Sequence, residues 1–143
     1  CLLSRGLGDV YKRQVCGSVS DAYDESYDKT TIIGGMEHCV YKLKQAYPSA
    51  LICFVAVHKN NRISTTDSTG ATLTYAEIFE KEKECCGKWA IPFIDIYNNG
   101  MNTRYVYNKE TYTYNQDGTH PNELGYKKFY VPIVLNVLNS IVY

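Results

Sequence analysis

Apolar residues between positions 31 and 47 recur with the spacing of a single helix face. The steps between them are four, four, three and four residues, and the positions are Ile32, Met36, Val40, Leu43 and Tyr47. This periodicity predicts an amphipathic helix over residues 31–47. Pro48 is expected to end the helix, because the residue before a proline avoids helical geometry.

Two later stretches are apolar without the alternation of a half-exposed strand. They are Ala50–Val57 and Ile91–Tyr97. Each predicts a short strand that is buried on both faces, as in a parallel sheet covered by helices. Pro92 stands near the start of the second stretch, where a strand tolerates proline.

A second helix is predicted between these strands. Thr74-Tyr75-Ala76-Glu77 has the form of a capping box, in which the Thr and Glu side chains satisfy backbone N–H groups at a helix start. The polar residues 58–71 before it predict a loop, and Gly87 is a plausible end. Residues 80–84 are expected to face water. The residues expected to face inward are Tyr75, Ile78, Phe79 and Cys86.

The last part of the chain begins as a loop and ends as a helix. Within the loop-like residues 98–116, four tyrosines alternate around Asn108-Lys109-Glu110, which suggests a small hairpin. These tyrosines are Tyr105, Tyr107, Tyr112 and Tyr114. The final helix is expected from Glu123 to about Ile141, and Pro132 should kink it or break it in two.

The predicted order is therefore helix, strand, helix, strand, helix. Alternation of this kind predicts an α/β protein with right-handed crossovers and a parallel sheet that has helices on both faces. The 143 residues correspond to about one domain. Two strands are too few to fill such a sheet, so we expect that N-terminal strands of the domain are missing from the chain.

Composition excludes several classes of protein. The 15 basic and 15 acidic residues cancel, so there is no basic footprint for nucleic acid. No apolar stretch approaches the roughly 18 residues of a membrane span. The six cysteines show neither Cys-x-x-Cys pairs nor zinc spacing, so no metal or other cofactor is expected. We interpret them as free thiols, with Cys39 and Cys53 buried.

The first fourteen residues do not resemble the rest of a folded domain. The segment CLLSRGLGDVYKRQ (1–14) resembles translated sequencing-adapter read-through, and it lacks the order of a signal peptide. We therefore expect residues 1–14 to be non-native and residues 15–143 to be the C-terminal part of a single domain. With the native N-terminus expected to be missing, the sequence gives no indication of the compartment.

The candidate chemistry lies in Asp117-Gly118-Thr119-His120-Pro121. Its spacing lets one carboxylate orient one imidazole from a single short turn, which supplies two of the three members of an acyl-transfer triad. Pro121 can then begin the final helix with a fixed φ. In an open α/β sheet, ligands bind beyond the carboxyl ends of the strands, and a turn that follows the last strand can reach that edge.

These residues resemble the last conserved block of the SGNH (GDSL-type) hydrolases. The block covers Asp117 to Asn122, with Gly125-Tyr126 after it, and the buried strands match the same family's order. The resemblance, which extends over residues 21–143, implies a three-layer α/β/α sandwich with a flavodoxin-like parallel sheet. It also implies serine ester hydrolysis, on carbohydrate acetyl esters or lipid esters, with Asp117 and His120 as catalytic residues.

The family's remaining catalytic groups are not found in the chain. By resemblance, a serine in a Gly-Asp-Ser block attacks the ester, and a glycine and the asparagine of a Gly-x-Asn-Asp block help to hold the oxyanion. Gly8-Asp9-Val10 has valine in place of the serine, and Gly17-Ser18-Val19-Ser20-Asp21 has no asparagine. We therefore expect no nucleophile in this chain and no ester hydrolysis by the chain alone.

Other interpretations remain open. His58 ends the first predicted strand and is a candidate substrate contact, although a loop histidine is the favoured interpretation. Asp95 is expected to cap a neighbouring loop. The chain could also be a non-catalytic α/β binding module in which Asp117 and His120 are structural. A metal phosphoesterase is disfavoured, because one histidine and scattered carboxylates do not build a two-metal site.

Overall fold

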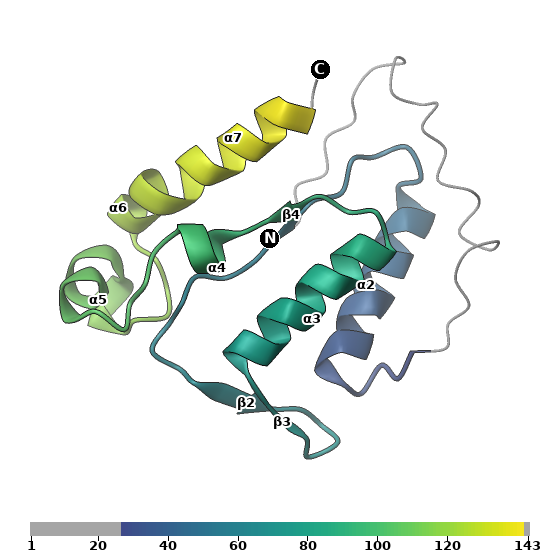
Figure 1. Cartoon of the computed structure of the whole chain (residues 1–143), viewed down its shortest axis with the longest axis horizontal. Coiled ribbons are helices and arrows are strands. Elements are labelled where there is room, and N and C mark those ends of the chain that lie inside the picture. The colour runs from purple at the N-terminus through teal and green to yellow at the C-terminus, as the bar shows by residue number, and fades with distance from the viewer. Residues whose placement is uncertain (1–26, 142–143) are drawn as a thin grey trace.

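The computed structural model describes residues 27–141 (Figure 1). The predictions for residues 1–14, for Gly8-Asp9-Val10 and for Gly17-Ser18-Val19-Ser20-Asp21 lie outside the described residues. Among the helices of residues 27–141, none combines the length and the apolarity needed to cross a membrane.

The described chain is a mixed α/β structure. Its longer helices are α2 (Ile32–Ala46), α3 (Tyr75–Lys88) and α7 (Val131–Ile141). The strands are short: β1 (Phe54–Val55), β2 (Ser64–Thr66), β3 (Thr72–Thr74) and β4 (Phe93–Ile94). The remaining elements are α4 (Ile96–Asn99), α5 (Val106–Tyr112), the 3₁₀ turn η2 (Tyr114–Gln116), α6 (Glu123–Gly125) and the π turn η3 (Tyr126–Tyr130).

Strands β1 and β4 form a parallel pair at the centre of the molecule. Phe54 lies opposite Phe93 and Val55 opposite Ile94. The apolar stretches predicted two buried strands of a parallel sheet, but only two residues of each stretch join the ladder, and Ile96 already begins helix α4. Both strands run in the same direction, so their carboxyl ends reach the same edge.

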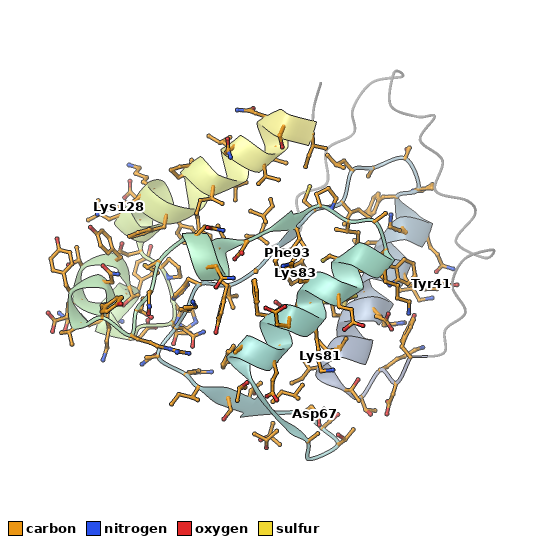
Figure 2. All side chains as sticks on the ribbon, in the orientation of Figure 1. Tyr41, Asp67, Lys81, Lys83, Phe93 and Lys128 are labelled. Atoms are coloured by element: carbon orange, nitrogen blue, oxygen red, sulfur yellow. The ribbon has the colours of Figure 1, made fainter. Side chains whose placement is uncertain are left out.

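Helices cover both faces of this pair (Figure 1). On one face, Trp89 and its neighbours from α2 and α3 form a cluster that includes Val40, Ile52, Cys85, Cys86 and Ile91. Figure 2 labels Phe93 on this side, where its ring lies 5.4 Å from that of Phe79 in α3. On the other face, Cys53, Ile94 and Ile96 contact the apolar residues of α7, namely Ile133, Val134, Val137, Leu138 and Ile141.

Helix α3 begins with the capping box that its sequence predicts. The Thr74 side chain accepts the N–H of Glu77 at 3.2 Å, and the Glu77 carboxylate accepts the N–H of Thr74 at 2.8 Å. The predicted end at Gly87 is wrong by one residue, because the helix continues to Lys88. The left-handed residue that follows is Ala90, with φ of 50°.

Replacing Thr74 with alanine should lower the free energy of unfolding by about 1 kcal/mol, the usual effect of losing an N-cap side chain. Urea unfolding monitored by circular dichroism measures this. Glu80→Ala on the exposed side of the same helix is the control and should change stability by less than about 0.5 kcal/mol. Equal losses in both variants would contradict the role of the cap.

Several other predictions need correction. Residues 58–71 are not a plain loop, since β2 and β3 pair antiparallel across a turn that Asp67 closes by accepting the N–H groups of Thr69 and Ala71. The tyrosine-rich stretch forms helix α5 and η2 in place of a hairpin. Cys39 is exposed, whereas Cys53, Cys85 and Cys86 are buried, and these four thiols are free.

Pro132 does not break the final helix. Residues 123–141 stay helical, but the turn η3 directly before the proline has π geometry, and Val131 N–H bonds the carbonyl of Tyr126. Proline removes one helical N–H and its ring collides with the carbonyl four residues earlier. A wider turn relieves that collision, so the helix accommodates Pro132 without ending.

Candidate active site

The Asp117–His120 turn is the end of a closed loop. Tyr114 donates its N–H to His120 O at 2.9 Å, and Asn122 donates its N–H to Tyr112 O at 2.9 Å, which joins the two sides of the loop. Inside the loop, three residues have left-handed backbones: Asn115, Gln116 and Gly118. The loop therefore turns sharply enough to bring Asp117 and His120 onto the same side.

Asp117 holds both the backbone and the ring of His120. Its Oδ1 accepts the N–H groups of Thr119 at 2.7 Å and His120 at 2.9 Å. Its Oδ2 lies 2.5 Å from His120 Nδ1. These contacts stabilise the carboxylate, so the His120 N–H, the His120 ring and the Thr119 N–H together lower the pKa of Asp117 to about 2.

This geometry fixes the tautomer of His120. An ionised carboxylate only accepts hydrogen bonds, so Nδ1 of a neutral His120 ring must carry the proton. Nε2 is then the basic nitrogen. The His120 side chain is 72% exposed, and Nε2 has no hydrogen-bond partner within residues 27–141. The arrangement presents an oriented imidazole base to the solvent.

The turn lies beyond the carboxyl ends of β1 and β4, as the sequence predicts for a ligand site. Lys59 follows β1 and forms a parallel bridge with Asn102, and Thr103 donates its N–H to Lys59 O at 2.8 Å. Thr103 in turn donates its hydroxyl to Gly118 O at 2.5 Å. These contacts attach the Asp117–His120 turn to the strand ends.

His58 is buried against the turn and is not open to a ligand. The residue as a whole is only 2% exposed. Nδ1 lies 2.7 Å from the Tyr130 hydroxyl, and Nε2 lies 3.4 Å from Gly118 O. Because both ring nitrogens face protein groups, the geometry favours a structural role over the substrate contact that its position at a strand end suggested.

Asp95 has a capping role, but it caps the start of a helix and not a neighbouring loop as predicted. Its side chain accepts the N–H of Asn98 at 2.7 Å and begins helix α4. The prediction was wrong in placing Asp95 within a strand, because β4 ends at Ile94. The carboxylate is thus committed to a helix start.

Sequence reasoning missed the residues that hold the turn from outside. The Thr113 hydroxyl accepts the N–H of Gly118 at 3.1 Å, and the Thr103 hydroxyl donates to Gly118 O. Tyr130 contacts the turn indirectly, because its hydroxyl bonds the His58 ring that faces Gly118. Asn61 lies against the turn, where its Oδ1 accepts the Thr119 hydroxyl at 3.4 Å. Polar residues so far apart in the chain carry no local pattern that would mark them.

The buried cysteines are poorly suited to redox chemistry. Burial raises the pKa of Cys85 to about 11 and that of Cys86 to about 12. The thiolate is the reactive form of cysteine, so little of it forms at neutral pH. No group of three or more His, Cys, Asp or Glu side chains within residues 27–141 is arranged to hold a metal ion.

Comparisons of the chain with profiles of known protein families, with curated proteins and with solved structures gave no match.

Proposed function

We propose that this chain carries the Asp–His part of an SGNH-type serine ester hydrolase. The observation that carries the proposal is the 2.5 Å contact between Asp117 Oδ2 and His120 Nδ1, combined with an exposed His120 side chain. The pair lies in the block that resembles the family's last motif and beyond the carboxyl ends of two parallel strands. These features support the proposal of a base oriented for acyl transfer.

In the proposed reaction, His120 moves the proton. Its Nε2 takes the proton of a serine hydroxyl as that oxygen attacks the ester carbonyl, and then returns it to the leaving alcohol. Asp117 stays ionised throughout, keeps the proton on Nδ1 and stabilises the imidazolium that forms. Its low pKa, about 2, suits this role because the carboxylate remains charged at neutral pH.

The nucleophile and the oxyanion donors have to come from elsewhere. Within residues 27–141, no serine hydroxyl is hydrogen-bonded to His120. By resemblance to the family, a Gly-Asp-Ser block supplies the serine and a Gly-x-Asn-Asp block supplies the donors. The proposed whole domain is a three-layer α/β/α sandwich with a flavodoxin-like sheet, and the helices on both faces of β1 and β4 are consistent with it.

The proposed substrates are small acyl esters, including acetylated carbohydrates and lipid esters. No cofactor is required for this chemistry, because the serine, the imidazole and the carboxylate carry out the bond-making and proton transfers themselves.

A non-catalytic binding module is the alternative, and one observation favours it. Asp117 Oδ1 accepts two backbone N–H groups of its own turn, which is the way an aspartate closes a purely structural turn. In this alternative, the His120 ring serves only to hold the turn. The two functions differ in whether the gene encodes a nucleophile for His120.

This chain should not hydrolyse p-nitrophenyl acetate faster than its His120→Ala variant by any saturable route, because no serine hydroxyl within residues 27–141 is hydrogen-bonded to His120. Initial rates over a range of ester concentrations measure this. A large saturable rate that requires His120 would show that the chain contains a nucleophile and contradict this part of the proposal.

The coding sequence upstream of residue 15 separates the two functions. We expect it to encode a Gly-Asp-Ser strand–turn–helix, and the longer protein to hydrolyse the same ester with turnover that Asp117→Asn and His120→Ala both remove. An upstream sequence without such a block, or activity indifferent to both substitutions, would favour the binding module.

A further inference from the structure

Gly118 is one point at which the rest of the fold holds the Asp117–His120 turn. Its N–H bonds the Thr113 hydroxyl at 3.1 Å. Its carbonyl accepts the Thr103 hydroxyl at 2.5 Å and faces His58 Nε2 at 3.4 Å. Since Gly118 stands between the two residues of the pair and has a left-handed φ of 75°, a rotation of its peptide would move them relative to one another.

The hydrogen bonds around His58 require one tautomer. A carbonyl oxygen only accepts, so His58 Nε2 must carry the proton that points to Gly118. In the neutral ring, Nδ1 is then an acceptor, and the Tyr130 hydroxyl donates to it at 2.7 Å. The Tyr130 oxygen also accepts the N–H of His58 at 3.3 Å. Both ring nitrogens of His58 and the Tyr130 hydroxyl are therefore paired donor to acceptor.

Burial favours the neutral forms of both the His58 ring and the Tyr130 hydroxyl. Desolvation lowers the pKa of His58, while the hydrogen bond to Gly118 O and the Asp117 charge oppose that shift and the His120 charge adds to it. Desolvation also raises the pKa of Tyr130 to about 12. At neutral pH the two hydrogen bonds therefore keep their direction: the Tyr130 hydroxyl donates to His58 Nδ1, and His58 Nε2–H donates to Gly118 O.

Tyr130 owes its position to the π turn before Pro132. It is the last residue of η3. A π turn takes one more residue than an α turn and so changes the direction of the side chains around it, which is why such turns recur at functional sites. Here the turn directs the Tyr130 hydroxyl to His58, and the ring lies edge-on to the imidazole with centroids 6.1 Å apart.

We propose that Tyr130 and His58 are positioning residues, which hold the Gly118 peptide and thereby keep His120 paired with Asp117. Their relevance to catalysis rests on the proposed ester hydrolysis, but their effect on the pair does not. These hydrogen bonds connect Tyr130, the last residue of η3, to the Asp117–His120 turn. Removing the Tyr130 hydroxyl alone leaves its ring in place, so Tyr130→Phe tests the connection with little change in packing.

The test uses the ring nitrogens of the histidines, of which the protein has three. Long-range ¹H–¹⁵N correlation spectra at a pH where the rings are neutral report which nitrogen of each ring is protonated. In the unaltered chain we expect His58 in the Nε2–H form and His120 in the Nδ1–H form. Tyr130→Phe should lower the ratio of Nδ1–H to Nε2–H in His120 about fivefold, the effect of one lost hydrogen bond.

Matched variants separate positioning from packing. Tyr126→Phe is the control, because this neighbouring ring also contacts Tyr130 but its hydroxyl makes no hydrogen bond to His58; it should leave His120 unchanged. His58→Leu should shift His120 as Tyr130→Phe does, and His58→Gln should restore part of the pairing, because its amide N–H can donate to Gly118 O. Circular dichroism checks that each variant is folded.

Two results would overturn the inference: an unchanged His120 tautomer in folded Tyr130→Phe and His58→Leu, or an equal change in Tyr126→Phe. The measurement needs no ester. A failure of the proposed hydrolysis therefore leaves this test unaffected, and a failure of this test leaves the hydrolysis proposal standing on its own experiments.

Discussion

Replacing Gly125 with alanine should destabilise the protein by about 3 kcal/mol, the upper range for forcing extra volume into a packed site. A Cβ on Gly125 would lie 2.4 Å from the backbone oxygen of Tyr112 and 3.3 Å from Pro121 Cβ. Backbone cannot swing aside as a side chain can, so α6 would have to move away from the end of α5. Urea unfolding measures the loss.

The control is Gly87→Ala in helix α3. A Cβ at Gly87 meets nothing within 4 Å, so alanine should raise stability by roughly 0.5–1 kcal/mol through its better helix propensity. A Gly125→Ala variant as stable as the original protein would show that the close approach of α6 and α5 does not constrain the fold.

The contact at Gly125 also bears on the site. Asn122 donates its side-chain N–H to Thr111 O at 2.9 Å and accepts the Gly125 N–H at 3.0 Å. The start of α6 is therefore fixed against α5 just after His120-Pro121. Displacing α6 should move the turn as well, which gives a physical reason for glycine in the Gly125-Tyr126 part of the block.

Local patterns predicted those elements whose signals lie within a few residues of one another. The apolar spacing at 31–47 gave α2 almost to the residue, and Thr74 to Glu77 gave the start of α3. The tyrosine alternation gave the wrong element, because residues 106–112 form helix α5 and not a strand. In α5, Tyr112 is buried by packing edge-on against Phe129 from the π turn, a contact that the sequence does not display.

The candidate site divides in the same way. Asp117 and His120 are three residues apart, so their pairing could be predicted from spacing alone. The groups that hold their turn lie at Thr103, Tyr130 and His58, and only the folded chain brings them together. The π turn that positions Tyr130 lies directly before Val131-Pro132, where the sequence predicted a kink or a break.

Glu82 is the clearest departure from the predicted polar face of α3. The sequence placed residues 80–84 in water, yet the Glu82 side chain lines a groove between α2 and α3, and the groove continues beside Phe54. Glu82 and Ile32 also line a second pocket, which has a volume of about 240 Å³ and further apolar walls that include Ile78 and Phe79. Burial there raises the pKa of Glu82 from 4.5 to about 7.

The sign of the resulting pH dependence follows from that shift. Below about pH 4.5, Glu82 is protonated whether the chain is folded or unfolded, so its burial does not lower the free energy of unfolding. Between about pH 4.5 and 7 the unfolded chain ionises Glu82 while the folded protein does not, and stability falls as pH rises. Above about pH 7 the folded protein also carries the Glu82 charge, now in the groove, and the loss of stability no longer changes with pH.

Replacing Glu82 with glutamine should therefore stabilise the protein at pH 8 and not at pH 4. The full shift corresponds to about 3 kcal/mol, and because the groove is open to water we expect a gain of roughly 2 kcal/mol. Urea unfolding at the two pH values measures it. Glu84→Gln, on the exposed side of the same helix, should change stability by less than about 0.5 kcal/mol at either pH. A gain for Glu82→Gln that is the same at both pH values would mean that the burial of its charge is not the cause.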